Sequence, residues 1–228
     1  MGEILVQVKQ VYKNFGPSLA LNGLSLDLQA HEQYAIQGPS GSGKSTLLYL
    51  LAGLDRPSAG EIVVAGKNLA QLDDEAAALY RQKMVGLVFQ FHFLLPTLTC
   101  IENIYLPARI SGVPVEGITA NVERLAVRLE VEHCLSKFPY ELSGGEQQRI
   151  NIIRALALTP PLLLCDEPTG NLDSVNAQRV ASLLAQLAQE KQMTLVVVTH
   201  DDAVASHFAH HLYLRDGQLV DRLAPGPH

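Results

Sequence analysis

Residues 38–45 read Gly38-Pro39-Ser40-Gly41-Ser42-Gly43-Lys44-Ser45. This stretch fits the pattern of a phosphate-binding loop, which ends in glycine, lysine and serine or threonine. A short strand-like stretch ends at Gln37 before it, and a helical pattern begins at Thr46 after it. A glycine-rich turn without a ligand would not account for all three features together. The sequence therefore predicts an α/β nucleotide-binding protein with a mainly parallel core sheet.

The loop has residues suited to each part of a nucleotide's phosphate chain. Glycines let backbone N–H groups turn toward phosphate oxygens, and the helix start presents its positive end to the anion. We expect Lys44 to reach the β- and γ-phosphates and the Ser45 hydroxyl to bind Mg²⁺. The whole of residues 38–46, including Thr46, is predicted to contact the nucleotide.

A pair of acids follows a second apolar run. Leu162-Leu163-Leu164-Cys165 has the continuous apolar character of a strand buried on both faces, and Asp166 and Glu167 come directly after it. Ligands bind at the carboxyl ends of strands in open α/β sheets. Asp166 is the predicted partner of Mg²⁺ and Glu167 the predicted general base. The alternative, two acids at a helix N-terminus, is partly favoured by Pro168.

A third apolar run, Thr194 to Thr199, leads to His200. A lone histidine is more often structural than catalytic, but its place at the end of a predicted core strand favours a role at the nucleotide. We expect His200 to hydrogen-bond the γ-phosphate or the attacking water.

The order of motifs resembles that of the ATP-binding-cassette ATPases over nearly the whole chain. Beyond the loop and the acidic strand, the matching stretches are Val85 to Gln90, Leu142-Ser143-Gly144-Gly145-Glu146 with Gln147-Gln148-Arg149, Asn171-Leu172-Asp173, and His200. We call residues 142–146 the signature. The resemblance implies that Gln90 contacts Mg²⁺ and the attacking water. It also implies that the chain hydrolyses ATP with Mg²⁺.

The same resemblance implies a site shared between two copies of the chain. Ser143, Gly144 and Gly145 would bind the γ-phosphate of an ATP held by the other copy, and Asp173 would cross the interface. A Ser-Gly-Gly turn before a long helical stretch is also, by its own chemistry, suited to an anion, although it could serve only as a helix cap.

Adenine recognition is implied for an aromatic residue near the N-terminus. Phe15 aligns with the residue that stacks on adenine in this family, and Tyr12 is the nearby alternative. A core or turn position is the alternative interpretation for Phe15.

Within the family, the chain is similar to the ATPases of lipoprotein-release and macrolide-efflux transporters. The residues that carry this are Phe91-His92-Phe93-Leu94-Leu95-Pro96 after Gln90, Ile101-Glu102-Asn103-Ile104, and Asp166 to Asp173. Glu146 stands where many relatives have glutamine, and Asn151 and Ile153 stand where small residues are common. These departures leave the subfamily open. A cell-division ATPase, or a non-transport ATPase acting on nucleic acid or the ribosome, is the alternative.

Composition agrees with one globular domain that works with a separate membrane protein. The chain has 228 residues, 47% hydrophobic content and a net charge of −6, without the basic stripe of a nucleic-acid binder. No apolar run reaches the roughly 18 residues of a membrane span, and the N-terminus lacks the features of a signal peptide. We expect a cytoplasmic protein held at the inner face of the membrane by a permease.

Cysteine and histidine positions do not predict a zinc site. Cys100, Cys134 and Cys165 lack metal-ligand spacing and suit a reducing compartment. His207 and His211 are four residues apart and could share a helix face, where solvent exposure is favoured over a metal.

The chain divides by pattern into a core and an insertion. Residues 1–90 and 161–228 are predicted to form the nucleotide-binding core, with antiparallel strands in the first thirty residues. Residues 91–160 are predicted to form a helical subdomain that ends in the signature helix. The permease is expected to dock near residues 90–107, at the apolar cluster Phe91, Phe93, Leu94 and Leu95, for which a helical core is the alternative. Asp216-Gly217 predicts a hairpin, and the tail at 224–228 is too short for a regulatory domain.

Overall fold

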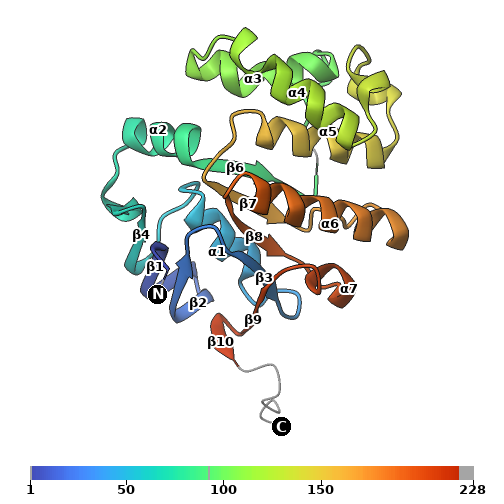
Figure 1. The fold of residues 1–228 in the computed structure, drawn as a ribbon. Helices are drawn as coiled ribbons and strands as arrows, with labels where there is room; N and C mark the ends of the chain where they lie inside the picture. Colours follow the sequence, from blue (N-terminus) through green and yellow to red (C-terminus); the bar gives the residue numbers. More distant parts are fainter. Residues whose placement is uncertain (1, 92, 221–228) are drawn as a thin grey trace.

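The computed structural model describes residues 2–91 and 93–220. Its described strands form a parallel-cored sheet and an antiparallel sheet, with helices around them (Figure 1). His92 and the tail at 224–228, which the sequence predictions mention, lie outside the described residues.

The parallel-cored sheet holds the nucleotide loop and the acidic pair. Its order is β10-β9-β3-β8-β7-β6, in which β9, β3, β8, β7 and β6 are parallel and β10 is antiparallel to β9. The strands are β3 (Gln33–Gln37), β6 (Val85–Val88), β7 (Leu162–Asp166), β8 (Thr194–Val198), β9 (His210–Arg215) and β10 (Gln218–Val220). The mainly parallel core predicted from the apolar runs is confirmed, and so is the hairpin, which turns at Asp216-Gly217.

The antiparallel sheet is built from the start of the chain. Its order is β2-β1-β4-β5, and the strands are β1 (Ile4–Phe15), β2 (Ser18–Gln29), β4 (Ala59–Val64) and β5 (Lys67–Asn68). Strands β1 and β2 alternate between buried and exposed residues over much of their length, as expected of a sheet with one covered face. The predicted antiparallel strands are therefore observed.

Several of the described helices begin with a side-chain cap. The helices are α1 (Lys44–Leu51), α2 (Asp74–Met84), α3 (Cys100–Ser111), α4 (Glu116–Arg128), α5 (Gly144–Leu156), α6 (Ser174–Glu190) and α7 (Asp202–Ala205), with short 3₁₀ turns η1 (Leu69–Gln71), η2 (Glu132–Cys134) and η3 (Pro139–Glu141). Helices α3 and α5 begin with complete capping boxes, Thr99 with Glu102 and Ser143 with Glu146. Figure 1 shows α3, α4 and α5 gathered at one end of the molecule, in green to yellow.

Both faces of the central parallel strands β3, β7 and β8 are buried, and each face belongs to a different apolar cluster. In β7, Leu162 and Leu164 pack with β1, β2 and α1, whereas Leu163 and Cys165 pack with the helices α3 to α6. Successive side chains of a strand point to opposite faces, so a strand between two cores must be apolar throughout. This explains the continuous run that predicts β7.

Candidate functional site: a phosphate-binding cavity at the strand ends

The predicted phosphate-binding loop joins β3 to α1. Gly43 caps α1 with a φ of 100°, a left-handed conformation that suits glycine. Lys44 turns its side chain back over the loop, and its Nζ donates hydrogen bonds to the carbonyl oxygens of Gly38 at 2.9 Å and Pro39 at 2.8 Å. Burial lowers the pKa of Lys44, while the negative charges of Glu167 and Asp166 act in the opposite direction. The ammonium group is thus held inside a cradle of backbone.

Close packing explains why the loop begins with glycine. A Cβ at Gly38 would lie 2.0 Å from the carbonyl oxygen of Leu214 on the neighbouring strand β9. A Cβ at Gly43 would lie 2.4 Å from the carbonyl oxygen of Ala20 on β2. The Ser42 hydroxyl is buried and has no hydrogen-bond partner among the described residues. A bare backbone cradle with an unpaired hydroxyl fits a phosphate ligand.

Asp166 is the last residue of β7 and lies opposite the start of α1. Its Oδ1 accepts a hydrogen bond from the Ser45 hydroxyl at 3.0 Å, and its Oδ2 accepts one from the Tyr49 hydroxyl at 3.3 Å. Burial raises the pKa of Asp166 above its ordinary value, and the two hydroxyl hydrogen bonds and the charge of Lys44 oppose the rise. Sequence reasoning paired Ser45 with Asp166 through a metal, but it missed Tyr49. The helical spacing of Ser45 and Tyr49, one turn apart, was the available signal.

Glu167 and His200 come from the ends of adjacent strands and are bonded to each other. The Glu167 Oε1 and His200 Nδ1 atoms are 2.8 Å apart, and the Glu167 side chain is 16% exposed against 74% for His200. Glu167 has a φ of 47°, in the left-handed region, and its backbone N–H donates to the carbonyl oxygen of Val198. No helix follows this acidic pair until Ser174, so the helix-terminus interpretation of the two acids is wrong.

These residues line one cavity of about 590 Å³ at the carboxyl ends of the parallel strands. Its lining contains most of the residues predicted to bind or act on the nucleotide: Gly38, Pro39, Ser40, Gly41, Gly43, Lys44, Ser45, Thr46, Gln90, Asp166, Glu167 and His200. Gln90 follows β6, and its carbonyl oxygen accepts a hydrogen bond from the Asn171 amide at 2.9 Å.

The signature lies elsewhere on the molecule. Among the described residues, no part of residues 142–146 lines the cavity. Ser143 and Gly144 are exposed at the start of α5, and the Ser143 hydroxyl donates to the Glu146 Oε2 at 2.6 Å. Asp173 is the N-cap of α6 and accepts hydrogen bonds from the N–H groups of Val175 and Asn176.

Phe15 and Tyr12 lie on β1, outside the cavity lining. Phe15 is 52% exposed and Tyr12 is 37% exposed. The Lys13 Nζ lies 4.9 Å from the centre of the Phe15 ring. The Tyr12 hydroxyl would lie 2.9 Å from a Cβ placed on Gly23, so its ring packs against β2. Phe15 presents the freer ring of the two.

The prediction that His207 and His211 share a helix face is wrong. Helix α7 ends at Ala205, and His211 belongs to strand β9. Phe208, between this helix and β9, is 3% exposed and packs in the cluster formed by the helices α3 to α6. Within the described residues, no helix is long and apolar enough to cross a membrane.

A loop that cradles phosphate, followed by a lysine and a hydroxyl facing a carboxylate at a strand end, defines the class of P-loop nucleotide triphosphatases. A family model described as ABC transporter matches residues 21–170. The chain belongs to this ATP-binding-cassette family, and it is an ATP-hydrolysing subunit of the transporter type.

Individual relatives agree over nearly the full length. The chain is 41% identical to the lipoprotein-releasing system ATP-binding protein LolD of Geobacter metallireducens, covering 95% of this chain and 98% of that one. It is 42% identical to the uncharacterized ABC transporter ATP-binding protein YvcR of Bacillus subtilis, covering 96% and 85%. A solved dimeric structure of the ATP-binding cassette MJ0796, in a post-hydrolysis state bound to ADP and Pi, is 37% identical, with a TM-score of 0.87 over 94% of this chain and 96% of that one.

Proposed function

We propose that two copies of the chain close around two ATP molecules and that each site takes its signature from the partner copy. The observation that carries this is the separation of the signature from the cavity. An exposed serine and two glycines at the start of a long helix are suited to bind an anion. The phosphate-binding loop of the same copy lines a different part of the molecule, so the anion would come from the other copy. The dimeric state of the similar cassette MJ0796 supports the same arrangement.

Within one copy, the cavity residues have different roles in ATP hydrolysis. Lys44 exchanges its bonds to the Gly38 and Pro39 carbonyls for the β- and γ-phosphates. Glu167 takes the role of general base, because its carboxylate lines the cavity and is oriented by His200. His200 and Gln90 orient the attacking water. The loop residues Gly38 to Thr46 bind the phosphates, and Phe15 stacks on adenine.

The Ser45 hydroxyl and the Asp166 carboxylate fit a Mg²⁺ site, because they already meet at 3.0 Å beside the cavity and offer the oxygen ligands that Mg²⁺ prefers. Gln90 would complete the protein's share. The bound ion would neutralise charge on the phosphates. It would also offset the burial that raises the pKa of Asp166.

A separate permease would transmit the movement to the membrane. Phe91 and Phe93 are 68% and 64% exposed beside Gln90, so the helical-core alternative does not describe these two residues. Next to them lies a mostly apolar cavity of about 430 Å³ between α2, β6, α3 and α5. We place the permease contact at Phe91 and Phe93, near residues 90–107, with this cavity at its edge. We expect the permease to hold the chain at the inner face of the membrane.

The cargo class follows from the relatives alone. Several similar proteins are named for lipoprotein release, so we propose release or efflux of a lipid-linked or apolar cargo. We also propose that the chain divides into a core, at 1–90 and 161–228, and a helical subdomain, at 91–160, which would separate the loop from the signature.

The test is the oligomeric state of a variant that binds ATP and hydrolyses it slowly. Glu167→Gln should be monomeric alone and dimeric with ATP in the absence of Mg²⁺, as measured by light scattering. The same variant with Ser143→Arg should stay monomeric in ATP, because the arginine fills the anion-binding turn. Dimers that persist with Ser143→Arg would overturn the shared site.

A further inference from the structure

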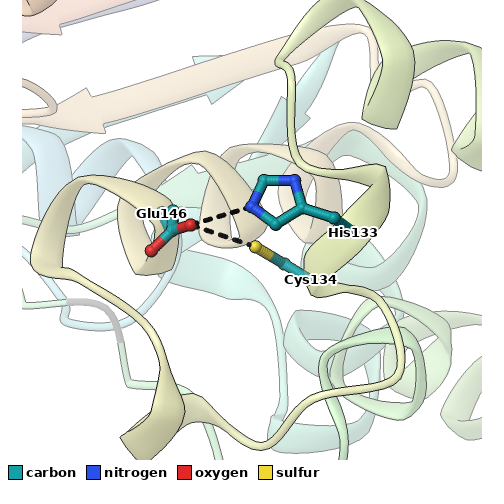
Figure 2. Close-up of side chains that lie close together, drawn as sticks. All are labelled: His133, Cys134 and Glu146. Carbon is teal, nitrogen blue, oxygen red and sulfur yellow. Dashed lines mark hydrogen bonds and ion pairs between the residues drawn. The ribbon is translucent and has the colours of Figure 1, made fainter.

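A mixed set of side chains meets at Glu146, the last residue of the signature, outside the ATP cavity. His133 and Cys134 belong to the 3₁₀ turn η2, and Glu146 lies in the first turn of α5. The Glu146 Oε1 atom is 3.0 Å from the His133 Nε2 and 3.4 Å from the Cys134 Sγ, and the three ligand atoms lie within 4.8 Å of one another (Figure 2). This cluster could not be predicted from the sequence, because its members are up to 13 residues apart and do not follow a known metal-ligand spacing.

We propose that His133, Cys134 and Glu146 form a binding site for a borderline transition-metal ion of the Zn²⁺ type. Imidazole nitrogen, thiolate sulfur and carboxylate oxygen are the ligand types of protein zinc sites, whereas Mg²⁺ and Ca²⁺ prefer oxygen alone. This set therefore differs in chemistry from the Ser45 and Asp166 pair.

The spacing is close to that of a tetrahedral site. With bond lengths of about 2.0–2.3 Å to zinc, two ligand atoms of a tetrahedron lie roughly 3.3–3.6 Å apart. The Sγ–Oε1 distance of 3.4 Å lies within that range, and the Nε2–Oε1 distance of 3.0 Å is a few tenths of an ångström below it. The Nε2 and Sγ atoms lie within 4.8 Å of each other. Small side-chain rotations would open the space that an ion needs between the three atoms.

The ligands are held in place and still reachable. The Glu146 Oε2 accepts hydrogen bonds from the Ser143 N–H at 2.8 Å and from its hydroxyl at 2.6 Å, so Oε1 remains directed at His133 and Cys134. Cys134 is buried, while the His133 side chain is 60% exposed and that of Glu146 is 21% exposed. An ion can therefore enter from the histidine side, and water can fill the fourth position. Binding must displace the thiol proton, which limits affinity because burial, followed by Glu146, raises the pKa of Cys134 to about 11.

A metal here would act on the signature through one carboxylate, and this part of the inference rests on the proposed shared site. The negatively charged Glu146 carboxylate accepts a hydrogen bond from the Ser143 hydroxyl. In the shared site, this hydroxyl is expected to donate to the γ-phosphate of the ATP held by the partner copy. An ion on Oε1 would neutralise that charge and free the hydroxyl for the phosphate. We therefore expect Zn²⁺ to strengthen ATP-dependent dimerisation.

Binding is tested on the full chain without an affinity tag, stripped with chelator and titrated with Co²⁺. The expected result is one Co²⁺ per chain with micromolar or tighter affinity, tetrahedral d–d bands, a sulfur-to-cobalt charge-transfer band, and displacement by Zn²⁺. The charge-transfer band should vanish in Cys134→Ser and weaken strongly in His133→Gln. It should persist in Cys100→Ser and His211→Gln, which alter a second buried cysteine and an exposed histidine of β9. Absence of the band, or its persistence in Cys134→Ser, would overturn the site.

Coupling is tested by light scattering of Glu167→Gln in ATP without Mg²⁺. Zn²⁺ should lower the protein concentration needed for dimers several-fold, and His133→Gln should remove this shift while the dimers themselves remain. Co²⁺ binding without any such shift would overturn the coupling and keep the site. Co²⁺ binding in a protein that never dimerises would count against the shared ATP site. Dimers without Co²⁺ binding would count against the metal site alone.

Discussion

At the scale of the residue, Glu167 and His200 form a bonded pair at the ends of two adjacent strands. The carboxylate lines the cavity and is largely covered, whereas the imidazole is mostly exposed. A second pair of the same kind, Glu32 with His210, joins a carboxylate and an imidazole at 3.1 Å outside the cavity lining. Variants of the two pairs can therefore be compared. The comparison shows whether an effect on hydrolysis comes from the position at the cavity or from the residue types alone.

Replacement of Glu167 by glutamine should slow hydrolysis by about 10²–10⁴-fold, the usual contribution of a general base. Binding of a fluorescent ATP analogue should be unchanged, since the amide retains the size and most of the hydrogen bonding. Phosphate release measures the rate. The matched variant Glu32→Gln should hydrolyse ATP at the normal rate. Unchanged turnover in Glu167→Gln would remove Glu167 from the role of base.

Gly38 packs so closely against a neighbouring strand that a side chain does not fit at this position. Gly38→Ala should lower the free energy of unfolding by at least about 2 kcal/mol, because the new Cβ overlaps the backbone of a neighbouring strand. Gly117→Ala, in helix α4 with no atom within 4 Å of the new Cβ, should be neutral or stabilising. Urea denaturation of both variants measures this. Equal stabilities would contradict the close packing at Gly38.

At the scale of the element, a charged pair joins strand β1 to the turn after α1. The Lys13 Nζ lies 2.6 Å from the Asp55 Oδ1 and also donates to the carbonyl oxygen of Arg56. Partial burial would raise the pKa of Asp55. The hydrogen bonds from Lys13 and from the Arg56 N–H, with the charge of Lys13, outweigh burial and hold the pKa below its usual value.

A carboxyl whose pKa is lower in the folded state contributes stability above its unfolded pKa and loses it as the pH falls through the folded pKa. Asp55→Asn should therefore lower the free energy of unfolding at pH 7 by roughly 0.5 kcal/mol, as for other half-exposed ion pairs. The difference from the parent protein should shrink as the pH falls below about 4. Denaturation at several pH values tests this, and a difference independent of pH would show that the charge is not the cause.

Elements whose signals are local could be predicted from the sequence. The apolar runs predicted β7 and β8, and the glycine-lysine-serine ending predicted the start of α1. Contacts between distant residues could not be predicted in this way. Tyr49 reaches Asp166 across 117 residues, and Cys134 meets Glu146 through the packing of η2 against α5. The helix face that His207 and His211 could share is not formed, because α7 ends at Ala205 and His211 belongs to β9.

At the scale of the whole molecule, the ATP cavity and the signature lie on different parts of one chain. The loop rests on the cluster formed with β1 and β2, and α5 rests on the cluster formed by α3 to α6. In the mechanism that we propose, ATP moves these two parts relative to each other, and a permease near residues 90–107 detects the movement. ATP shifts the population toward the closed pair only if both copies contribute contacts to it.

Complementation between two inactive variants tests the shared site most directly. Lys44→Ala removes the loop's cation, and Ser143→Arg blocks the signature, so each variant alone should hydrolyse almost no ATP. In a mixed pair, the intact loop of one copy faces the intact signature of the other, and one complete site is restored. We expect the mixture of the two variants to recover a substantial fraction of the parent's ATPase activity, measured by phosphate release. A mixture no more active than its separate components would contradict a site built from two copies.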